Sequence, residues 1–282
     1  MDVKHYEIRK PERLVPAMKG WEQAWYGYYR LREVTRTEIE ATNQERTLEV
    51  DCLLSIVADI NKRKEQYISL IELGAGWGET CMALAGIIDF KLIPHNIKSY
   101  SYLAIEAEPY YCDLIMKHFI VNNLPLKILR AAVSDKVGVC RFNQFTSPST
   151  YYGQGMTFGG NFGGSKLKTM ALAGYHLLIG KTVKVPMVTV DGLLGTIFPH
   201  VNIIQCDVQG VEDKVIKGAR ESIGQGKIDY WLIGTHHPKL NKKCRQMLES
   251  YYDCVVDVMP SKEKWMGLNQ DGTQLYKRKG LK

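Results

Sequence analysis

From Tyr67 onward, short apolar runs alternate with stretches in which apolar residues recur at helical spacing. The apolar runs predict strands at 67–73, 102–106, 126–132, 201–207, 230–235, 254–258 and 274–277. The stretches between them predict helices at 79–88, 109–123, 211–223 and 242–251. Strands that alternate with helices form mainly parallel sheets covered on both faces, so we expect a doubly wound α/β domain over residues 67–282.

The first 66 residues follow a different pattern and contain no clear strand. Apolar residues at helical spacing predict one amphipathic helix over 37–63: Val50, Leu53, Leu54, Val57 and Ile60. An aromatic cluster precedes this helix: Trp21, Trp25, Tyr26, Tyr28 and Tyr29. We expect residues 1–66 to form a helical extension that either caps the main domain or covers the substrate.

A segment at about 144–184 interrupts the alternation of strands and helices. Glycines recur there among polar and aromatic residues. A long irregular insert in a compact domain is usually functional or disordered. A mobile active-site loop and a plain disordered loop are both consistent with this composition.

The composition bounds the class of protein. The 282 residues are 45% hydrophobic, which is enough for one large core. No apolar run reaches the ~20 residues that span a bilayer, and the charged N-terminus lacks the apolar centre of a secretory signal. The seven cysteines form no C-x-x-C pair, which disfavours a disulfide framework or a zinc site. We therefore expect a cytoplasmic protein that does not enter a membrane.

The formal net charge of +7 has two interpretations. It is either a solvated basic surface or a means of attracting an anionic substrate, such as a phosphorylated or nucleotide-linked one. The sequence has no arginine-rich arm, so nucleic acid is disfavoured as a partner. The partner we expect is a small molecule, which is anionic in the second interpretation.

The strongest chemical signal follows the first predicted strand of the sheet. That strand ends in an acid and leads into alternate glycines and a helix: Glu72, Gly74, Ala75, Gly76 and Gly78. Glycine lets the backbone turn tightly and approach a ligand that a Cβ atom would exclude. The dinucleotide fingerprint G-x-G-x-x-G would need glycine at Glu79, and an acid there opposes a pyrophosphate. S-adenosylmethionine, which carries a sulfonium and an ammonium but no phosphate, fits better, and we expect these residues to hold its methionine part.

Two further segments leave predicted strands where the rest of this cofactor would lie. Glu106 ends the strand at 102–106, a place where an acid hydrogen-bonds ribose hydroxyls in nucleotide-binding α/β units. Glu108 is the alternative for this role. Ser134 and Asp135 follow the strand at 126–132. We expect Glu106 to hold the ribose, and Ser134 and Asp135 to flank the adenine.

An acid and two histidines follow later strands. Asp207 ends the strand at 201–207, and His236 and His237 follow the strand at 230–235. Ligands bind beyond the carboxyl ends of parallel strands, so these residues should converge beside the cofactor. Histidine acts as a general base near neutral pH, and we expect Asp207, His236 or His237 to take or orient the acceptor's proton. A metal site at these three residues is an alternative, but the spacing is not diagnostic and we expect no metal.

Glu212 falls in the first turn of the helix predicted at 211–223. An acid in that position suits the positive end of the helix dipole. We therefore interpret Glu212 as a structural residue.

Together these segments resemble the FkbM family of methyltransferases from about residue 70 to residue 252, with the insert excepted. The resemblance is carried by the segments Glu72-Leu73-Gly74-Ala75-Gly76, Ala104-Ile105-Glu106-Ala107-Glu108-Pro109, Asn122-Asn123, Ala132-Val133-Ser134-Asp135-Lys136, Val188-Thr189-Val190-Asp191 and Asp207-Val208-Gln209-Gly210-Val211-Glu212. His236 aligns with a histidine of the family. Gln209 stands where the family has glutamate, and Gly234 stands where it often has an acid shortly before that histidine. The resemblance implies a Rossmann-like methyltransferase fold, S-adenosylmethionine as cofactor, and O-methylation, often of sugar or secondary-metabolite hydroxyls.

Three other classes of protein stay open at this stage. An NAD-dependent oxidoreductase is disfavoured because the third glycine comes one residue early. Nucleic-acid methyltransferases that modify base amino groups often carry an Asp/Asn-Pro-Pro-aromatic motif after the fourth strand, where this chain reads Asp207-Val208-Gln209-Gly210. A non-catalytic cofactor-binding protein is compatible with the two departures from the family's pattern.

Overall fold

The computed structural model describes residues 1, 21–24, 26–31, 39–143, 182–265 and 268–282. Trp25 and residues 144–181 of the predicted insert lie outside the described residues. The alternatives stated for that insert therefore stay predictions.

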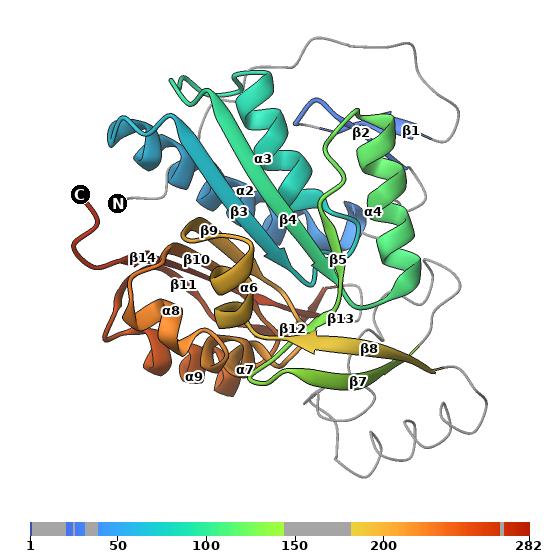
Figure 1. Cartoon of the computed structure of the whole chain (residues 1–282), viewed down its shortest axis with the longest axis vertical. Coiled ribbons are helices and arrows are strands. Elements are labelled where there is room, and N and C mark those ends of the chain that lie inside the picture. The colour runs from blue at the N-terminus through green and yellow to red at the C-terminus, as the bar shows by residue number, and fades with distance from the viewer. Residues whose placement is uncertain (2–20, 25, 32–38, 144–181, 266–267) are drawn as a thin grey trace.

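A central sheet organises the fold (Figure 1). Its strands are β3 (Tyr67–Leu73), β4 (Ser99–Glu106), β5 (Ile128–Arg130), β9 (Val201–Cys206), β10 (Ile228–Thr235), β11 (Tyr252–Val258) and β14 (Gly272–Arg278). They lie in the order β11-β14-β10-β9-β3-β4-β5. The strands from β10 to β5 pair in parallel, whereas β14 pairs antiparallel with both β10 and β11.

Helices cover both faces of this sheet because its buried strands are apolar on both sides. One face packs against α2 (Ile39–Lys62), α3 (Glu79–Asp89) and α4 (Pro109–Val121). The other face packs against α6 (Val190–Thr196), α7 (Glu212–Lys217), α8 (Arg220–Gly224) and α9 (Pro238–Leu248). Leu70 belongs to the first core and its neighbour Ile71 to the second, as the two-residue period of a strand requires. The predicted doubly wound, mainly parallel α/β fold is confirmed.

The direction of winding reverses between β3 and β9. The chain runs outward from β3 to β4 and β5, then crosses back to β9 and continues to β10. At the reversal the ends of the two strands are in register, with Leu73 opposite Cys206. In open α/β sheets, ligands bind beyond the carboxyl ends of the strands at such a point. The loops after β3, β4, β9 and β10 therefore define the place to look for a site.

Smaller sheets flank this edge. β8 (Thr182–Val188) pairs in parallel with β6 (Ala132–Val133) and antiparallel with β7 (Gly138–Asn143). β12 (Ser261–Trp265) and β13 (Leu268–Gln270) form a hairpin that precedes β14. The predicted strand at 126–132 is in fact divided between β5 and β6, which belong to different sheets.

The N-terminal region differs from the expectation that it contains no strand. β1 (Trp21–Gln23) and β2 (Tyr29–Leu31) form a short antiparallel hairpin. Side chains of α4 hold it, because the Tyr29 amide donates to Asn122 at its end and the Leu31 amide donates to His118. Three-residue strands are too short to show an alternating pattern, and contacts distant in sequence define them.

The helix predicted at 37–63 is α2. Its buried residues and Tyr26 belong to the same core as α3 and the sheet. The described part of the first 66 residues is therefore built into the main core.

The helix predicted at 211–223 is interrupted between α7 and α8. The interruption begins at Gly218, the C-cap of α7, where an added Cβ atom would lie 2.2 Å from the carbonyl oxygen of Ser134. No helix of the described residues has both the length and the apolar character needed to cross a membrane. All seven cysteines are free.

Gly86 of α3 provides a test of the packing between α3 and the N-terminal segment. An added Cβ would lie 2.0 Å from the carbonyl oxygen of Tyr26, so we expect Gly86→Ala to lower the free energy of unfolding by about 1–3 kcal/mol. Gly195 of α6 is the matched control, since a Cβ there meets nothing within 4 Å. Gly195→Ala should raise the free energy of unfolding by roughly 0.5–1 kcal/mol. Urea denaturation measures both, and unchanged stability of Gly86→Ala would contradict this packing.

Candidate functional site

The loop of residues 74–78, here called the glycine loop, joins β3 to α3. Gly74, Gly76 and Gly78 have φ angles of +74°, +54° and +83°, which place them in the left-handed region that favours glycine. At Gly74 there is also no room for a side chain, because an added Cβ would lie 2.0 Å from the carbonyl oxygen of Asp207. The glycine loop is therefore packed directly on the backbone that follows β9.

Glu72 lies beneath the glycine loop and is almost fully buried. Its two carboxylate oxygens accept hydrogen bonds from the amides of Thr80 and Cys81, at 3.0 and 2.9 Å. These amides belong to the first turn of α3, so Glu72 caps this helix from a distance. Burial raises the pKa of the Glu72 carboxyl to about 7, and the two hydrogen bonds oppose the shift.

Glu106 approaches the glycine loop from the end of β4. One carboxylate oxygen accepts from the amide of Gly76 at 2.8 Å, and the other accepts from the amides of Ala107 and Glu108 at 2.7 and 2.8 Å. Burial raises the pKa of Glu106 to about 7 as well. A carboxylate offers about four acceptor positions, so one is left for a ligand hydroxyl.

Glu108, the alternative for the ribose role, is occupied as the N-cap of α4. Its side chain accepts a hydrogen bond from the amide of Tyr111 at 3.2 Å. The geometry therefore favours Glu106 over Glu108 as the acid that faces a ligand above the glycine loop.

The glycine loop suits a cationic ligand better than a pyrophosphate. The amides of Gly74 and Ala75 both donate to the carbonyl oxygen of Ile105 at 3.0 Å, and that of Gly76 donates to Glu106. These amides are therefore not available to phosphate oxygens, which need them in a dinucleotide fold. The two buried carboxylates beside the loop would repel a phosphate and attract an ammonium or sulfonium. The residues present thus fit S-adenosylmethionine.

Ser134 and Asp135 follow β6, next to the strand end that carries Glu106. The amide of Ala131 donates to the carbonyl oxygen of Glu106 at 3.0 Å, which holds the two strand ends together. The Asp135 carboxylate pairs with the Lys217 ammonium at 2.8 Å, and this hydrogen bond holds the pKa of Asp135 below its usual value. Their predicted role beside the adenine stays a prediction.

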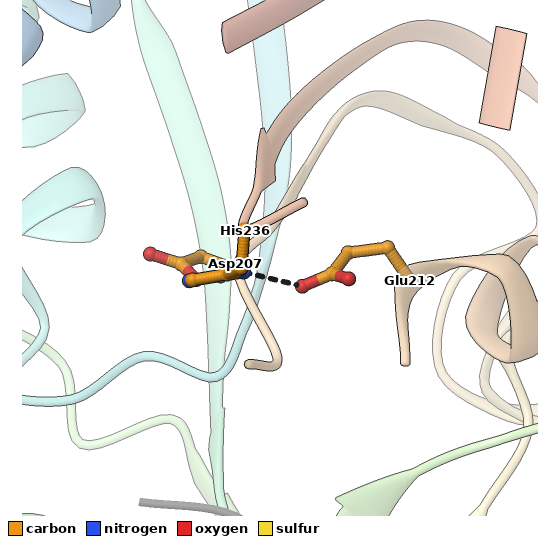
Figure 2. Close-up of side chains that lie close together, drawn as sticks. All are labelled: Asp207, Glu212 and His236. Carbon is orange, nitrogen blue, oxygen red and sulfur yellow. Dashed lines mark ion pairs between the residues drawn. The ribbon is translucent and has the colours of Figure 1, made fainter. Parts of the chain in front are cut away.

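A compact polar cluster lies just beyond the carboxyl ends of β9 and β10 (Figure 2). His236, just after β10, stands between two carboxylates. Its Nε2 atom lies 3.2 Å from Oδ1 of Asp207, which follows β9, and its Nδ1 atom lies 3.2 Å from Oε1 of Glu212 in α7. Asp271, just before β14, approaches the same Nε2 atom to 3.5 Å. We call these four residues the edge cluster.

The electrostatics of the edge cluster depart from the neutral histidine expected from the sequence. Burial lowers the pKa of His236, but the charges of Asp207 and Glu212 and the contacts with them outweigh burial and hold this pKa well above its usual value. Burial also raises the pKa of Asp271, to about 6. The raised pKa favours the protonated form of His236, which leaves Asp207, whose side chain is 36% exposed, as the candidate for accepting a proton among the predicted residues.

His237 is not part of this cluster, although it was predicted beside His236. It is the N-cap of α9, where its Nδ1 atom accepts a hydrogen bond from the amide of Lys239 at 3.1 Å. The structure thus brings two of the three predicted proton-handling residues together and gives the third a role as a helix cap.

The sequence reasoning missed Asp271 of the edge cluster, and it interpreted another member, Glu212, as a structural residue only. Glu212 does lie in the first turn of α7, but its side chain is fully buried, accepts from the Gly210 amide at 3.0 Å and points toward His236 (Figure 2). The positive φ angles of Gln209 and Gly210, +60° and +92°, turn the chain back so that this acid faces the strand ends. Its position five residues after Asp207 was the available signal.

Comparison with known proteins identifies a family. A family model described as the methyltransferase FkbM domain matches residues 81–258, a span that contains Glu106, Asp207, Glu212 and His236 and begins just after the glycine loop. No curated protein matches the chain.

Several solved structures are similar to this chain, at low sequence identity and low TM-score. TrmK from M. capricolum, solved with S-adenosylhomocysteine, is 7% identical, with 80% of this chain and 67% of that chain covered at a TM-score of 0.37. The N-terminal domain of human METTL16, also with S-adenosylhomocysteine, is 9% identical, with 92% and 88% covered at 0.43. The human methyltransferase 10 domain containing protein is 10% identical, with 81% of each chain covered at 0.40.

Glu106 provides a test of the cofactor site. Glu106→Ala removes the remaining acceptor position, so we expect it to weaken binding of S-adenosylhomocysteine by roughly 1.5–3 kcal/mol, the scale of a hydrogen bond to a charged group. Glu108→Ala is the matched control, because it removes a cap of α4 and should leave the affinity within a few-fold of the original. Isothermal titration calorimetry measures both. Loss of affinity in Glu108→Ala alone would move the role to Glu108.

The raised pKa values of Glu72 and Glu106 predict that cofactor binding depends on pH. Each carboxyl has a pKa of about 7 in the free protein, so each is largely protonated at pH 6. A ligand that presents an ammonium or hydroxyl donors favours the ionised form, and binding then releases protons. For one such carboxyl, affinity for S-adenosylhomocysteine should fall roughly tenfold from pH 8 to pH 6. Calorimetry in buffers of different ionisation enthalpy counts the protons; equal affinity at both pH values would contradict the expectation.

Proposed function

Because the chain belongs to the FkbM family of S-adenosylmethionine-dependent methyltransferases, we propose that it methylates a hydroxyl oxygen of a small molecule of the sugar or secondary-metabolite type. The observation that carries this proposal is the contact between Gly74 and Asp207. It sets a carboxylate, and the edge cluster around it, directly beside the loop that fits the cofactor. Transfer to oxygen requires a proton acceptor at this place.

The cofactor supplies an activated methyl group. With the cofactor bound, its methyl group would pass to the acceptor's hydroxyl oxygen, and the electron pair of the broken carbon–sulfur bond would stay on sulfur. The hydroxyl proton goes to the Asp207 carboxylate. The protein contributes alignment and proton removal, which are the parts of the rate that side chains control.

Burial assigns different roles within the edge cluster. Asp207 is partly exposed and can be reached by an acceptor, whereas Glu212 is fully buried. His236, with 17% of its side chain exposed, holds Asp207 in place through its Nε2 atom. The exposed carboxylate therefore meets the acceptor, and the buried pair behind it orients the carboxylate.

The net charge and the segment that follows β9 support this class of acceptor. The net charge of +7 suits an anionic acceptor, such as a nucleotide-linked sugar. The segment Asp207-Val208-Gln209-Gly210 lacks the prolines of enzymes that methylate base amino groups, so nucleic acid is the less favoured acceptor. The seven free cysteines fit a reducing, cytoplasmic setting.

The experiment is a transfer assay with S-adenosylmethionine labelled in its methyl group. A panel of free sugars, nucleotide-linked sugars and hydroxylated metabolites is offered beside total RNA. We expect label in an ether linkage on a member of the small-molecule panel. Label found only in RNA, or only on nitrogen, would overturn the proposal.

Variants of Asp207 and His237 test whether Asp207 accepts the proton and whether His237 only caps a helix. We expect Asp207→Asn to lower the single-turnover rate by roughly 10²-fold or more, the scale of general-base catalysis, with affinity for S-adenosylhomocysteine retained. His237→Ala should keep the rate within a few-fold and lower stability by about 1 kcal/mol through loss of the α9 cap. An unchanged rate in Asp207→Asn would place proton removal elsewhere.

A further inference from the structure

The edge cluster combines donor atoms that divalent cations bind. One atom from each of Asp207, Glu212 and His236 can be chosen so that all three lie within 4.8 Å of one another. No other group of at least three histidine, cysteine, aspartate or glutamate side chains within the described parts of the chain meets that condition. Two carboxylate oxygens and one imidazole nitrogen form a mixed donor set that suits Mn²⁺ or Mg²⁺, with Zn²⁺ as the softer competitor.

The contacts within the cluster are close but are not aligned as hydrogen bonds. Both ring nitrogens of His236 lie 3.2 Å from a carboxylate oxygen, yet neither makes a hydrogen bond. Neighbouring ligand atoms around a cation with bonds of about 2.1 Å lie about 3.0–3.4 Å apart. The 3.2 Å between Nε2 of His236 and Oδ1 of Asp207 matches one edge of such a coordination sphere. Glu212 faces the opposite ring nitrogen, so the imidazole or the Glu212 carboxylate must move to bring the three donors to a common centre.

The burial of Glu212 is a second, independent observation that favours a cation in the edge cluster. Glu212 is fully buried, and its Oε2 atom has no hydrogen-bond partner among the described residues. A buried carboxylate oxygen without a partner is costly unless a cation or a donor satisfies it. Within the edge cluster the only basic group is the His236 imidazole, which approaches Oε1 of Glu212 and not Oε2, and the other members are the carboxylates of Asp207 and Asp271. This excess of negative charge is what a divalent cation would neutralise.

We propose that Asp207, Glu212 and His236 bind a divalent cation of the Mn²⁺ or Mg²⁺ type, which holds the hydroxyl oxygen of the methyl acceptor beside the glycine loop. This role of the cation rests on the proposed O-methylation; the binding of the cation does not. Three protein ligands leave positions open for water and for the acceptor. Asp271, 3.5 Å from His236, lies outside the three ligands and orients the imidazole.

The cation changes how the proton leaves the acceptor. A hydroxyl oxygen bound to a divalent cation is a stronger acid than a free hydroxyl. Its proton passes to solvent water, the oxygen's electron pair forms the bond to the methyl carbon, and the pair of the carbon–sulfur bond stays on sulfur. Asp207 then acts as a ligand that fixes the oxygen, and the balance of atoms and charge in the transfer is unchanged.

Binding of Mn²⁺ provides a test that does not require the acceptor. The full chain, freed of metal by EDTA and dialysis, is titrated with MnCl₂ while electron paramagnetic resonance follows free Mn²⁺. We expect one strong site per chain, weakened at least about tenfold in His236→Ala and in Glu212→Gln. His200→Ala is the matched control. His200 also lies 3.1 Å from an aspartate, Asp229, but it is not part of the edge cluster, so this substitution should leave the strong site unchanged.

The Asp207→Asn variant controls for a loss of Mn²⁺ binding that is caused by misfolding. Its side chain is partly exposed, so the fold should persist, and each variant's thermal transition and affinity for S-adenosylhomocysteine are measured beside Mn²⁺ binding. Mn²⁺ bound equally well by His236→Ala, Glu212→Gln and Asp207→Asn would overturn the site. So would a wild-type chain that binds no Mn²⁺ at 1:1 stoichiometry.

The transfer assay separates this proposal from the proposed function. With an acceptor from the small-molecule panel, methylation should fall at least about tenfold in EDTA and return on addition of MnCl₂ or MgCl₂. Full activity in EDTA would remove the cation's role and leave the O-methyltransferase assignment intact. Strong Mn²⁺ binding that is lost in His236→Ala, with no hydroxyl methylated, would preserve the metal site and overturn the proposed function.

Discussion

The close approach of Gly74 to Asp207 is the contact on which the arrangement of the site depends. β3 and β9 are neighbours at the point where the winding of the sheet reverses, and the backbone after β9 leaves no room for a side chain at position 74. Glycine at 74 leaves that space to the backbone after β9. The cofactor side and the acceptor side of the site are thereby fixed to one another through the main chain, and their separation does not depend on flexible side chains.

The second constraint is that buried carboxylate oxygens need hydrogen-bond donors or positive charge around them. The two parts of the site differ in how far the protein meets this need. Glu72 and Glu106 accept hydrogen bonds from backbone amides of the glycine loop and of the helices beside it, so their burial stabilises the loop that they support. Glu212 accepts from a single backbone amide, and its second oxygen is left without a partner. The cofactor side of the site is therefore complete in the protein alone, whereas the edge cluster still requires positive charge.

The sequence predicted the features that follow from local pattern. Apolar runs and helical spacing located the strands of the sheet and most of its helices, and the acid-ended strand before Gly74 located the glycine loop. The hairpin at β1 and β2 was not predictable, because α4 side chains define it across about ninety residues of sequence. The role of Glu212 was also hidden: its place in a first helical turn has a sufficient local explanation, and only the fold shows that it faces His236.

The two departures from the family's pattern, Gln209 and Gly234, both lie next to Asp207 and both affect the charge around its carboxylate. Gln209 donates from its amide to Oδ1 of Asp207 at 3.4 Å, where a glutamate would set a second carboxylate against the first. A Cβ atom at Gly234 would lie 3.3 Å from Cγ of Asp207, so an acid there would crowd the same carboxylate. Each departure thus removes a negative charge next to Asp207, in a cluster that already holds more carboxylates than one imidazolium can balance. Asp207, whose backbone contacts Gly74, keeps a partly exposed carboxylate that can meet an acceptor or a cation, and the departures are compatible with an active site.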